Sequence, residues 1–405
     1  MEEKSLKSSI LSLISEKYNP SNVISTQISS PKYMSRSEIC DVLQRIAPLE
    51  KDTVIIINDH DRSTPTATII HYLRELQKIP FPVTFFVATG THSPTPLTAA
   101  QKLSDWKEGD KLIVHNCDNY NQHTFVGITS RKTEVWVENL VVTAKNILTI
   151  NSVEPHYFAG FTGGIKSIIP GLAARKTVEQ NHRWAMKQEA QILVAEGNPL
   201  FEDLWEAGNL CRDLSQIQTI QMINHGEQIK YLAVGSLKSA FNYAKLAALE
   251  FFGFPMTEKV DHIISFVAPP LDRTLYQAQK SMENVKKVLK DGGTFLLIAV
   301  CDDGIGNSNF FQRFLNYNSP QSLIKKLSFK HYKFGDHKAF YWGKLADRAQ
   351  IYYMGNLSDE EIQTAFMTKI SLDNLTNLLE KWNKKKETLL VDVAGGFTSC
   401  YVKND

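Results

Sequence analysis

Short apolar runs alternate with segments of helical periodicity along most of this chain. The segments 53–58, 82–90, 111–116 and 146–153 are rich in β-branched or aromatic residues, which is typical of strands buried on both faces. Between the first two lies an amphipathic stretch, TPTATIIHYLRELQKI, with a proline near its start, and TPLTAAQKLSDW follows the second. Both read as helices. Strands that alternate with helices predict a mostly parallel α/β sheet.

The pattern changes near residue 220. The segments 219–224 and 229–235 read as a strand pair joined by a turn at HGEQ, and a long helix is expected at about 236–250. A second α/β unit then begins with a strand at 260–270. A helix over 273–293 with a glycine stop, a strand and turn over 294–307, a helix at 336–350 and a strand at 351–355 follow. The sequence therefore predicts two α/β domains, 1–258 and 259–405, with largely parallel sheets and an active-site cleft between them.

Composition and charge exclude several classes of protein. Of 405 residues, 43% are apolar and 22% are charged, and the net charge is only +2. This balance gives no electrostatic reason to expect a nucleic acid or a membrane as partner. The N-terminus lacks the apolar core of a signal peptide, and no apolar run approaches the roughly 20 residues that span a bilayer. Five scattered cysteines without a CxxC pair favour a reducing cytoplasm.

Polar side chains cluster where the predicted strands end. NDHDRSTP supplies Asp59, Asp61 and Arg62, TGTHSP supplies His92, and EPHYFAGFTGG supplies His156. Ligands of parallel α/β sheets bind beyond the carboxyl ends of strands, so His92 and His156 are candidate functional residues. The NDHDRSTP segment allows two interpretations: its arginine binds an anion, or its acidic residues cap the N-terminus of the following helix. Surface or structural roles are the default for the other lone histidines, namely His60, His71, His123, His225, His262 and His331.

The glycine-rich segment 154–171 raises a specific question about Lys166. Glycines ahead of a short helix expose backbone N–H groups to an anion, although neither the GxxxxGK[ST] nor the GxGxxG spacing is present. The alternative is a tight turn with a solvated lysine. A desolvated lysine there is suited to pair with phosphate or to carry a covalent adduct. Gln277 and Lys280 share one helix face, for which a solvated surface is the simpler reading, as it is for the lysine run 381–387.

Several motifs in order resemble the nickel-dependent lactate racemase family, whose members racemise or epimerise 2-hydroxy acids. The resemblance rests on DHDR, TGTH, PHYFAGFTGGIKSIIPG followed by NH, QAQK and HKAFYW, between about residues 50 and 345. It implies nickel and a nickel-pincer nucleotide (pyridinium-3,5-bisthiocarboxylic acid mononucleotide), loaded by cofactor-synthesis proteins. The implied roles are a covalent cofactor tether at Lys166, a nickel ligand at His182, an acid–base pair in His92 and His156, carboxylate contacts from Arg62 and Lys280, cofactor or active-site contacts from Asp59, Arg62, Gly164 and Gln277, and a substrate-side aromatic at Trp342.

The implied mechanism is reversible hydride transfer from C2 to the cofactor through a transient 2-keto acid. One histidine removes the hydroxyl proton, and inversion needs a base on either side of the substrate. The sequence departs from the family at Ser93, where an arginine often follows the histidine, and His115 and Asp118 are expected near the same rim. These differences leave the choice of 2-hydroxy acid open. Two other readings stand beside this one: a non-catalytic nucleotide-binding or sensor relative, and another metal-dependent enzyme acting on a small hydroxy acid.

Overall fold

A computed structural model describes residues 3–26 and 32–403, and the chain forms two compact units. One unit comprises residues 30–251, and the other comprises residues 1–29 together with 252–405. The predicted domains were 1–258 and 259–405, so the boundary was placed within seven residues but the N-terminal segment was assigned to the other unit. The described part of that segment adds a helix and an edge strand to the C-terminal sheet.

The unit of residues 30–251 is built on a six-stranded sheet in which only one pairing, β10 with β11, is antiparallel. The strands, in order across the sheet, are β11 (Gln228–Ser236), β10 (Ile217–His225), β7 (Asn146–Ser152), β2 (Thr53–Asn58), β3 (Thr84–Ala88) and β4 (Lys111–Val114). The predicted strands and the predicted hairpin at 225–228 are confirmed. A further hairpin, β5 (His123–Ile128) with β6 (Glu134–Glu138), was not anticipated.

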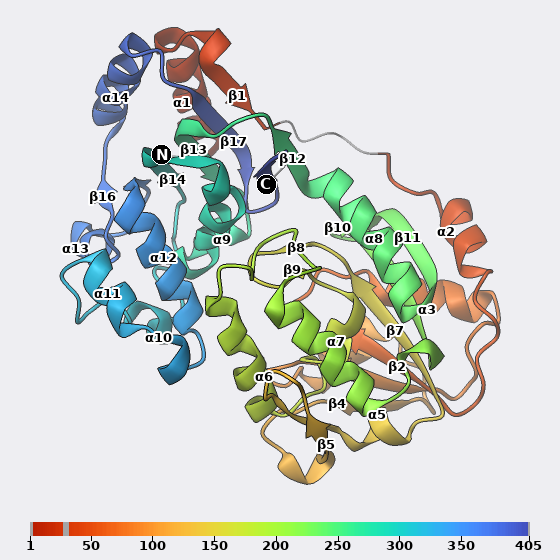
Figure 1. Ribbon diagram of the computed structural model, residues 1–405. Helices are drawn as coiled ribbons and strands as arrows, with labels where there is room; N and C mark the ends of the chain where they lie inside the picture. The colour runs from red at the N-terminus through yellow and green to blue at the C-terminus, as the bar shows by residue number, and fades with distance from the viewer. Residues whose placement is uncertain (1–2, 27–31, 404–405) are drawn as a thin grey trace. The chain divides into compact units, whose positions relative to one another are not determined.

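Helices cover both faces of this sheet (Figure 1). They are α2 (Arg36–Leu43), α3 (Thr66–Glu75), α4 (Leu97–Leu103), α5 (Asn139–Thr143), α6 (Arg175–His182), α7 (Pro199–Cys211) and α8 (Leu237–Phe252). Alternate residues of β2 enter two cores: Val54 and Ile56 pack with α6 and α7, whereas Ile55 and Ile57 pack with α2 and α3. Burial on both faces explains the uninterrupted β-branched run.

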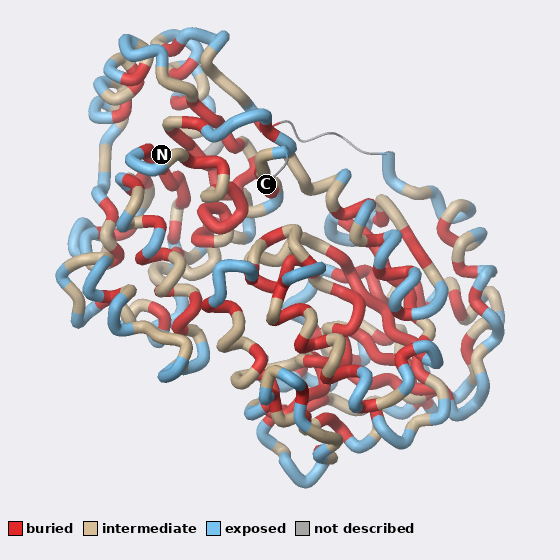
Figure 2. The backbone as a smooth tube through the Cα atoms, viewed as in Figure 1, coloured by how far each residue is buried: buried red, intermediate tan, exposed pale blue. Residues whose placement is uncertain are grey.

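The second unit has a six-stranded sheet that is parallel throughout. Its strands, in order, are β1 (Val23–Ser25), β17 (Leu389–Gly395), β13 (Val260–Val267), β14 (Leu289–Ile298), β15 (Gln350–Met354) and β16 (Thr368–Lys369), and β12 (Gly253–Met256) pairs separately with β18 (Ser399–Val402). Its helices are α1 (Glu3–Lys17), α9 (Leu275–Val285), α10 (Ser308–Phe311), α11 (Pro320–Lys326), α12 (Asp336–Arg348), α13 (Asp359–Thr364) and α14 (Leu372–Lys384). Figure 2 shows buried strands in both units, and helices in which buried and exposed residues alternate. The predicted α/β class with largely parallel sheets is confirmed.

One helix ends earlier than its sequence indicated. The prediction extended the helix over 273–293 to its two glycines, but α9 ends at Val285 and β14 begins at Leu289. Gly292 and Gly293 therefore lie inside the strand. A Cβ on Gly293 would come within 2.6 Å of the Asp261 carbonyl oxygen, so this glycine permits close approach of two backbones rather than stopping a helix.

No helix among the described residues combines the length and apolar character required to cross a bilayer.

Candidate active site

The polar segments that follow β2, β3 and β7 meet at one edge of the 30–251 sheet. Because these strands are parallel, their carboxyl ends lie on the same side. The backbone N–H of Gly90, in the TGTH segment, donates to the Gly171 carbonyl at 2.9 Å and so ties this segment to the glycine-rich loop. The predicted gathering of the three motifs is thus seen in the structure.

Asp59 and His92 form a close pair at this edge. His92 Nδ1 lies 2.7 Å from Asp59 Oδ2, and the Asp61 carboxylate lies 3.5 Å from the same nitrogen. Asp59 is only 3% exposed, whereas 44% of the His92 side chain is exposed. An ionised carboxylate only accepts hydrogen bonds, so Nδ1 carries the proton. In the neutral form of this ring, the lone pair is therefore on Nε2, the nitrogen that does not contact Asp59.

The loop that carries Lys166 is packed tightly against its own protein. Gly163 and Gly164 have φ values of +76° and +56°, and a Cβ on Gly164 would lie 2.7 Å from the Phe241 ring. The Gly164 N–H donates to Gln221 Oε1 at 3.0 Å. The reading of these glycines as an open anion cradle is therefore not supported at Gly164, whose amide is already occupied.

Buried polar side chains on β7 and β10 hold this loop in place. Asn151 bonds to Ser167, the residue after Lys166, and Gln221 Nε2 donates to Thr219 Oγ1 at 2.5 Å. The hydroxyl oxygen of Thr219 in turn lies 2.6 Å from the hydroxyl oxygen of Thr149 on the neighbouring strand. Sequence reasoning missed this network. Its signal was present, because polar residues recur inside two strands that are otherwise apolar on both faces.

Lys166 and His182 are partly buried side chains, and burial lowers the pKa of both. Burial, and after it repulsion from the Arg62 guanidinium, together lower the pKa of the Lys166 amine to about 7. His182 lies at the end of α6. Burial, and after it repulsion from the Lys166 charge, lower the pKa of its imidazole to about 3. The amine is therefore substantially neutral at pH 7, and the imidazole is neutral.

Aromatic contacts connect His182 with His156. The Phe158 ring lies edge-on to both, with centroid distances of 5.3 Å to His182 and 4.4 Å to His156. The His156 ring also stacks on Tyr157 at 5.2 Å. His156 Nδ1 accepts the Ala159 N–H at 3.3 Å, so the neutral ring carries its proton on Nε2.

Two predicted site residues, Gln277 and Lys280, lie on α9 in the other unit. Gln277 lines a surface hollow of 520 Å³ at the start of that helix, and its Oε1 is buried without a hydrogen-bond partner among the described residues. The positive charge of Lys280 contributes to lowering the pKa of Lys338 to about 7, after the larger effect of burial.

Trp342 and His115 are placed differently from their predictions. Trp342 is 2% exposed, donates its indole N–H to the Ala365 carbonyl at 2.7 Å and packs against Phe310 and Phe314. It is a core residue of this structure with its polar atom satisfied, and its substrate contact stays a prediction. His115 is fully buried rather than on a rim. Asp118 forms a bidentate pair with Arg175 at the surface.

Two family models match the chain. The lactate racemase N-terminal domain matches residues 6–193, and the lactate racemase C-terminal domain matches residues 258–385. A lactate racemase of Thermoanaerobacterium thermosaccharolyticum is 30% identical over 296 residues, covering 70% of this chain and 68% of the relative. A lactate racemase of Lactiplantibacillus plantarum is 24% identical over 321 residues, covering 77% and 75%.

Solved structures show the same fold. The lactate racemase apoprotein from T. thermosaccharolyticum superposes with a TM-score of 0.79 at 23% identity, over 97% of this chain and 92% of the other. A protein from Thermotoga maritima superposes with a TM-score of 0.68 at 16% identity, over 93% and 100%. With both family domains matched in order and a 30% identical relative covered over two thirds of its length, the chain belongs to the lactate racemase family of isomerases.

Proposed function

We propose that this protein racemises or epimerises a 2-hydroxy acid at C2, with a nickel-pincer nucleotide as cofactor. The observation that carries the proposal is the opposite proton placement on two histidines. His92 donates a hydrogen bond from Nδ1–H to Asp59, which leaves the lone pair of the neutral ring on Nε2. His156 uses Nδ1 as an acceptor and holds a proton on Nε2. One ring is therefore set as a base and the other as an acid.

Inversion of a carbon centre requires this pairing. The histidine on one side of the substrate removes the hydroxyl proton of one stereoisomer, and the histidine on the other side returns a proton to form its mirror image. The reverse reaction exchanges these roles. Asp59 would hold His92 in the tautomer that accepts a proton and would stabilise the imidazolium that results.

The residues present fit the cofactor that the family implies. Attachment through a lysine needs a neutral amine, and the pKa of Lys166 is lowered to about 7. Nickel binds neutral imidazole, and His182 is neutral because burial lowers its pKa to about 3. When bound, the nickel-pincer nucleotide supplies an electrophile that accepts and returns hydride. Lys166 would hold it, His182 would ligate the metal, and cofactor-synthesis proteins would load it.

Arg62 is suited to bind the substrate carboxylate. It is exposed, and its charge reaches the Lys166 amine. A guanidinium contacts a carboxylate with two parallel hydrogen bonds, which would fix the substrate while its C2 centre inverts. The binding roles of Gln277 and Lys280 stay predictions.

A substrate panel tests the proposal. Nickel-loaded protein is offered lactate, malate, 2-hydroxyglutarate and sugar acids as single stereoisomers, without NAD, and the products are separated by chiral chromatography. We expect one acid to be converted clearly faster than the others. Absence of turnover with every acid would refute the proposed reaction and favour a sensor role.

Substitution of each histidine tests the acid–base pair. His92→Ala and His156→Ala should each lower interconversion by about 10²- to 10⁴-fold, the usual contribution of a general acid or base. His71→Ala, on the exposed face of α3, is the matched control and should keep full activity. Each active-site variant should still change the cofactor spectrum with one stereoisomer, and the two variants should prefer opposite ones. The same preference in both would contradict the pairing.

Peptide mapping and metal analysis test the cofactor assignment separately. Active protein should carry a mass addition on Lys166, and His182→Ala should lose nickel while keeping its circular dichroism spectrum. An unmodified Lys166 in active protein, or unchanged nickel in the variant, would remove the corresponding role.

A further inference from the structure

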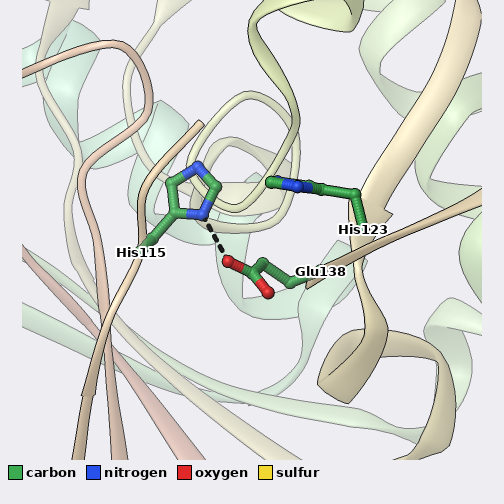
Figure 3. Close-up of side chains that lie close together, drawn as sticks. All are labelled: His115, His123 and Glu138. Carbon is green, nitrogen blue, oxygen red and sulfur yellow. Dashed lines mark hydrogen bonds and ion pairs between the residues drawn. The ribbon is translucent and has the colours of Figure 1, made fainter. Parts of the chain in front are cut away.

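A second cluster of potential metal ligands lies outside the proposed nickel and acid–base residues. His115 follows β4, His123 begins β5 and Glu138 ends β6. His123 and Glu138 are direct partners across the β5–β6 hairpin, so their side chains emerge on the same face. Figure 3 shows the His123 ring extending from its strand toward the other two side chains. One ligand atom from each residue lies within 4.8 Å of the others.

All three side chains are buried, with exposed fractions of 0% for His115, 7% for His123 and 5% for Glu138. Uncompensated burial of a carboxylate and two imidazoles is costly, so their partners matter. His115 has an acceptor at each ring nitrogen: Nδ1 lies 2.8 Å from Glu138 Oε1, and Nε2 lies 3.2 Å from the Ala173 carbonyl oxygen. Each ring nitrogen thus faces an oxygen that can accept a hydrogen bond, whereas a neutral imidazole carries only one N–H.

His123 has the complementary arrangement. Its Nδ1 lies 2.9 Å from the Asn119 carbonyl oxygen, which fixes the proton on that nitrogen. Its Nε2 is buried and has no hydrogen-bond partner among the residues that the structure describes. A buried lone pair therefore stands beside a carboxylate and a second imidazole.

We propose that His115, His123 and Glu138 bind one Zn²⁺ ion. A single cation would satisfy all three groups together: His115 Nδ1, His123 Nε2 and a Glu138 oxygen become ligands. The remaining nitrogens donate to the Ala173 and Asn119 carbonyl oxygens. Backbone carbonyls are usual outer partners of metal-bound histidines. Two imidazoles and a carboxylate suit Zn²⁺, with a water as fourth ligand.

The geometry requires only local adjustment. Ligand atoms of a tetrahedral zinc ion are about 3.3 Å apart for bonds of about 2.0–2.1 Å. The His115–Glu138 contact of 2.8 Å would open slightly, and the wider separations, at most 4.8 Å, would close. The backbone N–H of His115 donates to the Val87 carbonyl oxygen at 3.1 Å, and this bond anchors the residue to β3. The ion would thus clamp the β5–β6 hairpin to the sheet edge, and it is distinct from the nickel proposed at His182.

Zinc titration of the full chain tests this proposal. Protein stripped with a chelator should bind one Zn²⁺ per chain by isothermal titration calorimetry, with a dissociation constant at or below about 1 μM. His123→Gln and Glu138→Gln should each weaken binding by about 100-fold or more, since loss of a direct ligand should cost at least as much as loss of its outer partner. Zn²⁺ should raise the thermal midpoint of the wild type more than that of either variant.

Asp59, Asp61 and His92 form another group of potential metal ligands, and a variant of this group provides the necessary control. His92→Ala should leave zinc binding intact. Wild-type protein that binds no zinc, full binding by His123→Gln and Glu138→Gln, or loss of binding in His92→Ala would each overturn the assignment. If a glutamine variant fails to fold, NMR of the wild-type histidines decides: zinc must shift the ring signals of His115 and His123, and unchanged signals refute the site.

Discussion

At the residue scale, burial and neighbouring charge decide what each candidate side chain can do. His92 and His156 are the same residue type, but different Nδ1 partners give them opposite proton placements. Lys166 differs from an ordinary surface lysine because its amine is poorly solvated and lies near the Arg62 guanidinium. Residue identity thus supplies the chemistry, and the surroundings select the protonation state.

Lys166 should react as an amine at unusually low pH. Its pKa is lowered to about 7, so half of the amine is neutral near that pH, whereas an ordinary lysine has a pKa of about 10.4. Cofactor-free protein is treated with acetic anhydride between pH 6 and 10, and acetylation is followed by peptide mapping. The Lys166 rate should reach half its maximum near pH 7. A midpoint near that of the exposed lysines in the same digest would contradict the lowered pKa.

At the element scale, the fit between the glycine-rich loop and its neighbours decides where Lys166 lies. Gly164 has positive φ and approaches the Phe241 ring of α8, while its N–H is bonded to Gln221 of β10. The loop therefore depends on packing against a helix and a strand that are more than fifty residues away in sequence. The pattern of glycines alone did not distinguish this packing from an anion site.

Gly164→Ala should destabilise the 30–251 unit more than Gly226→Ala. Both glycines have φ near +55°, but a Cβ at Gly226 meets nothing within 4 Å, whereas one at Gly164 meets Phe241 at 2.7 Å. Both substitutions carry the cost of placing alanine at positive φ. The difference between the two variants in the free energy of unfolding by urea therefore measures overpacking against Phe241, and it should be about 1–3 kcal/mol. Equal destabilisation by both changes would show that the contact with Phe241 relaxes freely.

A buried carboxyl in β17 should make the stability of its own unit depend on pH. Burial raises the pKa of Asp392 from 3.8 to about 6, against hydrogen bonds from Ser265 and Thr26. Between these values the folded state binds more protons than the unfolded state, so this contribution is complete below about pH 4 and is lost as pH rises through about 6. Asp392→Asn removes it. Urea unfolding is measured for both proteins between pH 4 and pH 7. Over this range the free energy of unfolding of the variant should rise relative to that of wild type by roughly 1–3 kcal/mol. A difference between the two proteins that does not change with pH would exclude this linkage.

At the scale of the whole molecule, the N-terminal segment completes the sheet that is otherwise formed by the C-terminal part of the chain. Strand β1 pairs with β17 in parallel, and Ile10, Ile14 and Tyr18 of the preceding segment pack into the core formed with α14. Tyr18 Oη also donates to the Glu387 carbonyl at 2.7 Å. Such distant pairing is invisible to local periodicity, which explains why residues before 30 were assigned to the other domain.

Deletion of residues 1–26 should therefore weaken one unit selectively. Hydrogen exchange followed by mass spectrometry should show faster exchange in β17 and α14, because they lose a parallel partner and a helical cover. Exchange in β2 and β7, which belong to the other unit, should stay as in wild type. Unchanged protection of β17 would mean that the N-terminal segment adds little to the sheet.

The sequence alone determined the features that depend on local pattern. Apolar periodicity located the principal strands, since a strand buried on both faces needs an uninterrupted apolar run. The order of short motifs identified the family and placed the Asp59, His92, His156 and Lys166 segments at strand ends. Tertiary structure decided what depends on distant neighbours: the burial of Trp342 in a core, the occupied amide of Gly164 and the meeting of His115, His123 and Glu138. Hydrogen bonds and burial between residues far apart in sequence leave no periodic trace in it, so only the folded chain defines them.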